Sequence, residues 1–337
     1  MGGGADGFVE ALTALARRLV PGSDGIVGLK RLSGGAIQEA WVFEAGGERF
    51  VLRRAPAGIE RQRDTAMPLA AEARLIALAG AACVPVAPIR HVLEPEDGLG
   101  AGFVMGFVAG ETIPRKILRD AEYAAARPLL AGQCGAVLAR LHRIDPAALP
   151  PLRVSPAAAE LAQYRALYDS YGEPRPVFAF AFRWLQANLP ADTEPSALVH
   201  GDFRNGNLMI GPEGLRAVLD WELTHLGDRH EDLGWICVNS WRFGQIDQPV
   251  GGFGSREALF EAYEAAGGAP VDRARVKFWE VLGTLKWGIM CSGMAASFMS
   301  GADPAIERGT IGRRSSETEL DLLRLLGAGA AYPATVT

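Results

Sequence analysis

A short β-hairpin with acidic and amide side chains at both of its ends constrains this chain more than any other feature. Asp202 follows the apolar segment 197–200, and Asn207 comes five residues after it. The hairpin turns at residues 211–214, which are Gly-Pro-Glu-Gly, and its second arm leads into Asp220. Because the two ends of a short hairpin lie close together, Asp202, Asn207 and Asp220 are expected to converge on one point.

Two carboxylates and an amide at one point suit phosphoryl transfer from a magnesium–nucleotide complex. That reaction needs a carboxylate to orient the attacking hydroxyl and accept its proton, and oxygen ligands to hold Mg²⁺ against the phosphates. Asp202 is placed for the first role, and Asn207 and Asp220 are placed for the second. The alternative is an ordinary polar turn followed by a chance Asp. The Gly-Asp pair at 227–228 and the Asp-Leu pair at 232–233, both in register downstream, disfavour that alternative.

These segments resemble the H-G-D-x-x-x-x-N loop and the following D-x-E of the aminoglycoside phosphotransferase family, whose members are small-molecule relatives of protein kinases. In this chain they are residues 200–207 and 220–222, and residues 226–235 match the family's G-D then D-L entry into a helix. The likeness spans roughly residues 29–326. It is strongest to the branch that also occurs as the kinase-like part of acyl-CoA-dehydrogenase-related proteins, although this chain is expected to have no room for a dehydrogenase domain.

The resemblance implies a role for each residue of the loop. Asp202 would be the catalytic base, and Asn207 and Asp220 would be the magnesium ligands. Arg204 stands two residues after Asp202, where protein kinases commonly carry a Lys that contacts the γ-phosphate. It would therefore stabilise charge on the transferring group, with a surface salt bridge as the alternative.

A metallophosphoesterase is a second interpretation of the same region. The stretch 225–232 is rich in His, Asp and Glu and could superficially supply a dinuclear metal set. Against this interpretation, no early Asp-x-His motif is present, and the Gly-Asn pair at 206–207 continues into Leu208 instead of His. The family resemblance instead implies that Asp232 anchors the catalytic loop and that Glu222 supports the metal ion.

Strand patterns dominate the front third of the chain, and helical patterns dominate the rest. The expected strands are 28–32, 40–44, 49–53, 87–92 and 103–108, with a helix between 64 and 79 and a hairpin pair, Asp97-Gly98, between the last two strands. Further helices are expected over 130–142, over 156–189 with a break at 172–174, and after 232, around a small β element at 197–219. Together with the resemblance, this organisation predicts an α+β, bilobal, protein-kinase-like fold. The small antiparallel-sheet N-terminal lobe would be residues 1–107, and the larger, mainly helical C-terminal lobe would be residues 108–337.

The N-terminal lobe is expected to bind the nucleotide, ATP or GTP, together with Mg²⁺. A glycine-rich hairpin lets backbone N–H groups approach phosphates, although an ordinary turn would also explain its glycines. Arg53 stands where protein kinases place a Lys, and it would pair with Glu72 and with the phosphates. Arg54 would take this role if the strand register were shifted by one residue. The hairpin residues assigned to the phosphates are Ser33, Gly34 and Gly35.

The end of the last front-lobe strand is expected to be the hinge between the lobes. Backbone groups around residues 106–108 would meet the edge of the adenine ring, which assigns Phe107 and Val108 to the nucleotide site. Met105 would line the adenine pocket, with ordinary core packing as the alternative.

Composition excludes several classes of function. The net charge of −5 argues against a nucleic-acid surface, which needs clustered Lys and Arg. The four cysteines form no C-x-x-C pair, so reduced thiols are expected. No run of eighteen apolar residues is present to span a membrane. The glycine-rich start, residues 1–7, lacks the pattern of a signal peptide and is expected to be loose, so a cytoplasmic location follows by elimination. The sequence indicates no oligomeric state.

The phosphate acceptor is expected to be a hydroxyl group of a small molecule bound by the helical body, residues 155–190 and 235–315. A polycationic aminoglycoside would need a pocket dense in carboxylates, and the acidic residues here have the spacing of exposed helix faces. An apolar or mixed hydroxylated metabolite fits better, and the branch resemblance adds a hydroxyacyl thioester. The acidic residues concerned are Glu160, Asp247, Glu257, Glu261 and Glu264.

Two further interpretations involve the same fold. A pseudokinase would bind nucleotide without catalysis, and Arg53 in place of Lys is the one departure that favours it. A Ser/Thr protein kinase is disfavoured because no A-P-E segment follows Asp220, and because the twelve residues to Asp232 leave no room for an activation loop.

Overall fold

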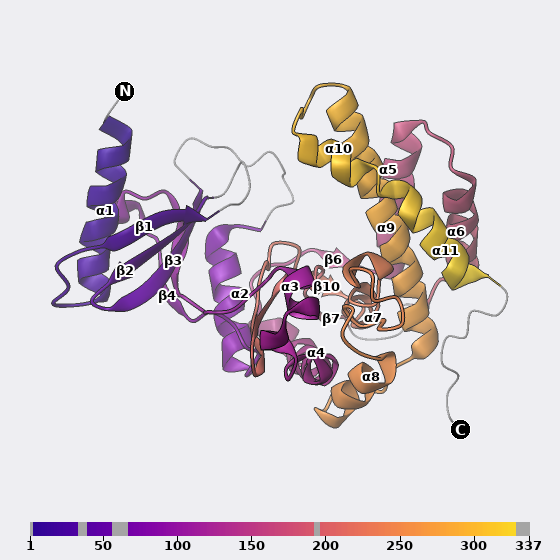
Figure 1. The fold of residues 1–337 in the computed structure, drawn as a ribbon, viewed down its shortest axis with the longest axis horizontal. Coiled ribbons are helices and arrows are strands. Elements are labelled where there is room, and N and C mark those ends of the chain that lie inside the picture. Colours follow the sequence, from indigo (N-terminus) through magenta and orange to yellow (C-terminus); the bar gives the residue numbers. More distant parts are fainter. Residues whose placement is uncertain (1–2, 33–38, 56–66, 192–195, 328–337) are drawn as a thin grey trace.

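The computed structural model describes residues 3–32, 39–55, 67–191 and 196–327. A sheet-rich part carries the N-terminus at one end of the molecule, and a larger helical part forms the other end (Figure 1). The predicted phosphate-binding residues Ser33, Gly34 and Gly35 lie outside the described residues. Within these ranges, no helix combines the length and the apolar character needed to cross a membrane.

Five antiparallel strands form the sheet, in the order β1-β2-β3-β5-β4. Each of the five predicted strands is present, with ends shifted by a few residues. Arg53 lies in the middle strand, opposite Ala40 on one side and Phe103 on the other. The strands are β1 (Val27–Leu32), β2 (Glu39–Ala45), β3 (Glu48–Ala55), β4 (Ile89–Val92) and β5 (Ala101–Gly106).

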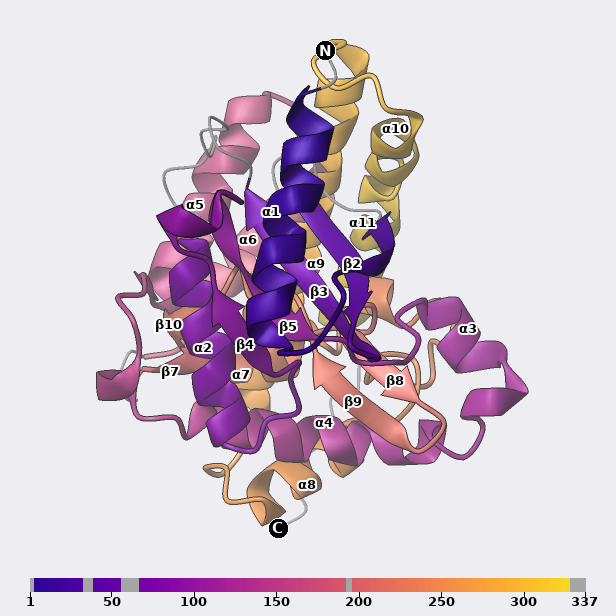
Figure 2. The ribbon, with the colours of Figure 1, turned by 90° about the vertical axis from the view of Figure 1, so that its left-hand side faces the viewer.

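A helix covers each face of this sheet. Leu12 of α1 (Gly3–Leu19) packs with Val104 of β5, and Figure 2 shows α1 crossing the sheet. Phe103, the neighbour of Val104 in β5, belongs instead to the core that contains α2 (Leu69–Ala81). Because successive strand residues point to opposite faces, α1 and α2 lie on opposite sides. The predicted apolar face of α2 is buried throughout: Leu69, Leu75, Ile76 and Ala79.

The prediction of a loose N-terminus is wrong beyond its first residues. α1 begins at Gly3 and buries Leu12, Leu15 and Ala16. Apolar residues recur at 8, 11, 12, 15, 16 and 19, which is the spacing of one helix face. The helix was not predicted because the glycines at the start have a low helix propensity. Packing of the apolar face against the sheet outweighs this propensity.

The prediction that Asp97 and Gly98 form a short hairpin turn between the last two strands is also wrong. β4 and β5 do pair, but the connection contains a 3₁₀ helix, η1 (Pro95–Asp97), that ends at Gly98 with φ 66°. The side chain of Asp97 accepts a hydrogen bond from the backbone N–H of Glu94 at 2.8 Å and contacts His91 at 2.8 Å. It also forms an ion pair with Arg18 of α1. These contacts hold Asp97 inside the longer turn.

The helical part is organised around α9 (Arg273–Met299), which runs through its centre (Figure 1). Helices α5, α6, α7, α10 and α11 pack along it. The predicted break at 172–174 separates α5 from α6, as expected. The remaining helices are α3 (Pro114–Arg119), η2 (Ala121–Tyr123), α4 (Arg127–His142), η3 (Pro146–Ala148), α5 (Ala157–Tyr171), α6 (Pro176–Ala187), α7 (His230–Trp235), η4 (Asn239–Trp241), α8 (Arg256–Ala265), α10 (Ile306–Gly312) and α11 (Ser315–Leu326).

The small β element contains the predicted hairpin and a second sheet that the sequence did not reveal. β8 (Leu208–Gly211) and β9 (Gly214–Val218) form the hairpin. β7 (Ala197–Val199) pairs with β10 (His225–Gly227), which also pairs with β6 (Val154–Ser155). β6 and β10 contain two and three residues, too few to show an alternating pattern.

Helices α4 and α8 approach closely at a glycine. A Cβ atom at Gly135 would overlap the backbone carbonyl oxygen of Leu259 in α8. At Gly132, one turn earlier on α4, the nearest heavy atom to a Cβ would be Ala262 Cβ at an ordinary 3.7 Å. Glycine is therefore required at position 135 and not at position 132.

Gly135→Ala should lower the free energy of unfolding by about 1–3 kcal/mol, because a backbone oxygen cannot move aside. Gly132→Ala is the matched control, and it should raise the free energy by up to about 1 kcal/mol through helix propensity alone. Urea denaturation measures both variants. Equal effects of the two substitutions would contradict the close approach of α4 and α8.

Candidate active site

The loop that carries Asp202 is anchored by one buried carboxylate, that of Asp232 in α7. Its Oδ2 accepts a hydrogen bond from the backbone N–H of His200 at 2.8 Å, and its Oδ1 accepts one from Gly201 at 3.0 Å. His142 Nε2 of α4 contacts Oδ2 at 3.1 Å. Burial would raise the pKa of Asp232, but the contacts with His142 and His200 lower it below its ordinary value. Asp232 thus holds the loop as a charged group, as expected from the sequence.

Asp202 lies at the centre of a hydrogen-bond network. Its Oδ1 accepts from Arg204 Nε at 3.0 Å and from Trp235 Nε1 at 2.8 Å. Its Oδ2 accepts from Asn207 Nδ2 at 2.6 Å. The contacts from Arg204 and Asn207 join residues that the sequence grouped together. Trp235 was not singled out as a site residue, because the sequence pattern does not show which way its indole N–H points.

The amide of Asn207 has a defined orientation. Its Nδ2 donates both to the side chain of Asp202 and to the backbone carbonyl of Asp202, the latter at 3.0 Å. The amide nitrogen therefore faces Asp202, which leaves the amide oxygen to face elsewhere and to act as an acceptor or a metal ligand. The backbone of Asn207 also accepts from the N–H of Leu219 at 2.9 Å, which closes the base of the β8–β9 hairpin.

Asp220 follows the hairpin directly and has φ 62°. A positive φ is uncommon for a residue other than Gly and recurs at functional sites. Asp220 lies near the same imidazole as Asp202. Burial lowers the pKa of His200, and the charges of Asp232, Asp202 and Asp220 oppose that lowering. The bond from the Leu219 N–H to Asn207 brings the backbone that enters Asp220 beside Asn207, and the convergence of the Asp220 side chain on Asp202 and Asn207 stays a prediction.

Arg204 packs over the loop and does not extend into solvent. Its guanidinium lies 4.7 Å from the centroid of the Trp241 ring, and its side chain is 26% exposed. Gly206, at φ 116°, leaves room for it, because a Cβ there would lie 2.7 Å from Arg204 Nη1. The salt bridge considered for Arg204 exists, and its partner is Asp202 itself.

Arg53 forms the predicted ion pair with Glu72. Its Nη1 lies 3.2 Å from Glu72 Oε1, and the Glu72 side chain is 1% exposed. Its Nη2 lies 3.9 Å from Glu222 Oε2, two residues after Asp220. The alternative register is excluded, because Arg54 points to the other face and pairs with Glu39 at 2.9 Å.

The expected hinge follows β5. Met105 lies opposite Val51 and Ile89 in the sheet and packs against the main core. The backbone N–H of Phe107 donates to the carbonyl of Arg49 at 3.0 Å. That donor is therefore already used within the protein, whereas the N–H of Val108 donates to no group in the described part of the chain.

The residues of the metallophosphoesterase interpretation do not gather around one point. His225 contacts Glu231 at 3.1 Å, while His230 contacts Asp228 at 2.7 Å. Across the described ranges, no three His, Cys, Asp or Glu side chains form a set that could hold a metal ion. The structure therefore gives this interpretation no support.

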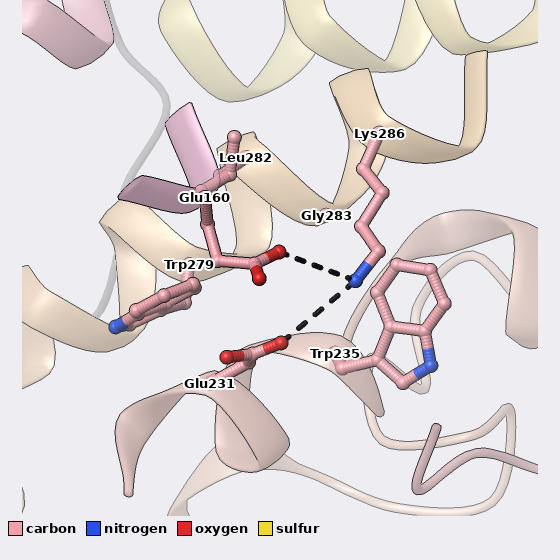
Figure 3. A pocket seen from close by; sticks show the side chains of 7 residues that line it. All are labelled: Glu160, Glu231, Trp235, Trp279, Leu282, Gly283 and Lys286. Atoms are coloured by element: carbon pink, nitrogen blue, oxygen red, sulfur yellow. Dashed lines mark ion pairs between the residues drawn. The ribbon is translucent and has the colours of Figure 1, made fainter. Parts of the chain in front are cut away.

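A small cavity lies beside the network, on the other side of Trp235 (Figure 3). The ammonium of Lys286, in α9, lies 3.8 Å from both Glu160 and Glu231. Burial would lower the pKa of Lys286, but Tyr164, Glu231 and Glu160 raise it above its ordinary value. The other residues that line the cavity are Trp235, Trp279, Leu282 and Gly283.

The expectation that Glu160 is an exposed helix carboxylate is wrong. Glu160 is 2% exposed and accepts hydrogen bonds from Arg153 at 2.8 Å and from Ser155 at 2.5 Å. Helical spacing alone did not reveal that α5 turns this residue toward α9. Lys286 is the one charged residue in the stretch 281–291 of α9, which is a sequence signal for a charged partner but does not identify Glu160 as that partner.

The chain matches the model of the phosphotransferase enzyme family over residues 28–279. Among curated proteins, it is 28% identical over 233 residues to acyl-CoA dehydrogenase family member 10 of Mus musculus, and 27% identical over 229 residues to family member 11 of Gallus gallus. These matches cover 64% and 63% of this chain but only 21% and 28% of the two relatives. The chain thus spans a minor part of these relatives.

Solved structures show the same fold. A putative aminoglycoside phosphotransferase from Ralstonia eutropha superposes with a TM-score of 0.72 at 22% identity, covering 94% of this chain and 97% of that one. A spectinomycin phosphotransferase in complex with ADP and spectinomycin superposes with a TM-score of 0.62 at 14% identity, covering 93% and 98%. The α+β, kinase-like fold predicted from the sequence is confirmed.

The contacts of Glu160 with Lys286, Ser155 and Arg153 should make the stability of the protein depend on pH in acid. Burial would raise the pKa of Glu160, but Lys286, Ser155 and Arg153 lower it to about 2. A lowered folded-state pKa contributes stability that is present above the ordinary pKa and is lost as the pH falls toward the folded value. The free energy of unfolding should therefore fall by roughly 3 kcal/mol between about pH 5 and pH 2 through this one group.

Glu160→Gln should flatten the pH dependence by that amount in urea denaturation at successive pH values. Glu261→Gln, on the exposed side of α8, is the control for loss of a carboxylate. Parallel pH profiles for Glu160→Gln and the parent would show that Glu160 is not held as an ion.

Proposed function

Because the chain belongs to the phosphotransferase enzyme family, which it matches over residues 28–279, we propose that it transfers the γ-phosphate of ATP to a hydroxyl group of a small molecule. The observation that supports the proposal is the contact between Asp202 and Asn207 at the base of one hairpin, with Asp220 next to the Leu219 N–H that donates to Asn207. These are the groups that phosphoryl transfer needs, a base and two oxygen donors for a hard cation.

Asp202 is the base in this proposal. Its carboxylate orients the acceptor hydroxyl and takes its proton as the oxygen attacks the γ-phosphorus. Arg204, in contact with Asp202 at 3.0 Å, is close enough to place positive charge near the transferring phosphate.

The donor set fits Mg²⁺, which prefers amide and carboxylate oxygens. Asn207 presents its amide oxygen because its nitrogen is bound to Asp202, and Asp220 supplies a carboxylate. When bound, Mg²⁺ neutralises charge on the phosphates. Glu222 lies two residues beyond Asp220 and contacts Arg53, which suits a supporting role.

We place the nucleotide, ATP or GTP, against the sheet-rich part, residues 1–107, and the acceptor against residues 108–337. Arg53, held by Glu72, faces the phosphates, and Ser33, Gly34 and Gly35 remain assigned to them from the sequence. Met105 lines the base pocket, and the base meets the backbone at Phe107 and Val108. Since the N–H of Phe107 is engaged by Arg49, we assign the donor to Val108.

The residues that line the cavity beside Trp235 bear on which acceptor molecule could bind there. The two carboxylates that line this cavity, Glu160 and Glu231, are both paired with the Lys286 ammonium. They are therefore already engaged and do not form the carboxylate-rich pocket that a polycationic aminoglycoside would need. Acyl-CoA dehydrogenase family members 10 and 11 contain the matching segment, and we therefore take hydroxylated acyl compounds as the first acceptors to test. A metabolite-library screen that follows MgATP-dependent ADP release identifies the acceptor.

Asp202→Ala should lower turnover by about a thousandfold, because the acceptor hydroxyl loses its base. The affinity for MgATP, measured by titration calorimetry, should stay within about threefold of the parent, since Asp202 is not assigned as a metal ligand. Asp247→Ala, at an exposed position, is the control. Near-normal turnover in Asp202→Ala would reject the mechanism.

Asp220→Ala should weaken MgATP binding about tenfold or more, because one of two metal ligands is lost. Binding of ATP in the presence of EDTA should be unchanged, which separates the metal from the nucleotide. Calorimetry with and without Mg²⁺ tests this. Equal losses under both conditions would show that Asp220 acts on the nucleotide or on the fold. No binding of MgATP by the parent itself would remove the proposed function, the pseudokinase alternative included.

A further inference from the structure

Trp235 reaches the proposed base directly. Its indole Nε1–H donates to Oδ1 of Asp202 at 2.8 Å, a shorter contact than the one from Arg204. Trp235 is the last residue of α7, three residues after Asp232. One short helix therefore supplies both the carboxylate that anchors the loop and an N–H group that binds the carboxylate of the base.

The two oxygens of Asp202 are unequally occupied. Oδ1 accepts from two donors, Arg204 and Trp235, whereas Oδ2 accepts only from Asn207 among the described residues. A carboxylate oxygen has about two lone-pair sites. Oδ1 is therefore fully occupied, and one site is left on Oδ2. A hydroxyl group that binds to this carboxylate must approach Oδ2.

The indole is held by its surroundings and not by Asp202 alone. A Cβ at Gly283 of α9 would lie 2.9 Å from Trp235 Cε3, so the ring lies directly against the backbone of that helix. The Trp241 ring lies 5.2 Å away between centroids, and Lys286 Nζ lies 5.3 Å from the indole centroid. Figure 3 shows the ammonium beside the ring. The direction of the N–H is thus set by the packing of α7 on α9.

On the basis of the proposed function, we infer that Trp235 is a positioning residue for the base, one that fixes Oδ1 of Asp202 so that Oδ2 faces the acceptor hydroxyl. In the transfer step the hydroxyl oxygen bonds to the γ-phosphorus and its proton passes to Oδ2. The bond from phosphorus to the bridging oxygen breaks, and its electron pair leaves with ADP. Trp235 makes no bond in this step and acts only through the orientation of Asp202.

Trp235→Phe tests the inference, because it keeps an aromatic ring and removes the N–H. The assay is ADP release from MgATP alone, with water as the acceptor, and the dissociation constant for MgATP is measured by titration calorimetry. We expect kcat to fall about tenfold to a hundredfold and the dissociation constant to stay within about twofold. A residue that only stabilises the fold would not lower kcat in a variant that melts well above the assay temperature.

Trp287→Phe is the matched control. Trp287 belongs to the same aromatic cluster, with its ring 5.0 Å from that of Trp241, and its N–H donates to no group in the described part of the chain. The chemical change is the same, but no contact with Asp202 is lost. We expect kcat within about twofold of the parent.

Gly283→Ala is a second, independent variant. It keeps the indole N–H and pushes a methyl group against the ring, so kcat should fall while MgATP binding is kept. If Trp235→Phe does not fold, as judged by thermal melting, this variant decides the question. An unchanged kcat in a folded Trp235→Phe or Gly283→Ala protein overturns the inference and leaves the proposed function intact. A parent that releases no ADP, either alone or with any acceptor of the library, removes the proposed function, and the inference falls with it.

Discussion

The architecture of the candidate site depends on the buried carboxylate of Asp232. Two consecutive backbone N–H groups, of His200 and Gly201, donate to it, and His142 contacts it from α4. A charged group that is 0% exposed is tolerated only when its hydrogen bonds are satisfied. The contacts that satisfy Asp232 also set the path of the loop on which Asp202 lies. The geometry of the proposed base is therefore a consequence of how one buried charge is solvated by the protein.

The same helix links this anchor to the cavity beside Trp235. Asp232 and Trp235 stand three residues apart on α7, which places them on one side of the helix. The close approach of α7 to α9 at Gly234, where a Cβ would lie 2.7 Å from Trp279 Cβ, fixes where the indole lies. Beyond the indole lies Lys286 with its two carboxylates. The indole of Trp235 therefore lies between this cavity and the carboxylate of Asp202.

Arg53 connects the sheet to this region. It stands in the middle strand and contacts Glu72 of α2 on one side and Glu222, beyond the hairpin, on the other. A guanidinium can contact two carboxylates at once, because its N–H groups form a planar fork, whereas an ammonium is a compact charge. The replacement of the usual Lys by Arg is therefore compatible with an intact ion pair and adds a contact to the segment that contains Asp220.

The sequence indicated much of the site because its chemistry lies in short segments. The spacing of Asp202, Asn207 and Asp220 around a hairpin is a local property, since neighbouring residues and turn chemistry decide it. The apolar face of α2 followed from periodicity for the same reason, whereas the pairing of Arg53 with Glu72 was implied by the resemblance to protein kinases. By contrast, the helix at 3–19 was overlooked because packing against the sheet stabilises it despite its glycines.

The burial of Glu160, the direction of the Trp235 indole and the position of Lys286 could not be derived from the chain alone. Each depends on how α5, α7 and α9, which are far apart in sequence, pack on one another. Short-range patterns specify which side chains share an element and a face. Contacts between elements, set by close packing at residues such as Gly234 and Gly283, decide which of those side chains meet. The residues proposed to react were therefore encoded locally, and the surroundings that orient them were determined only by the tertiary fold.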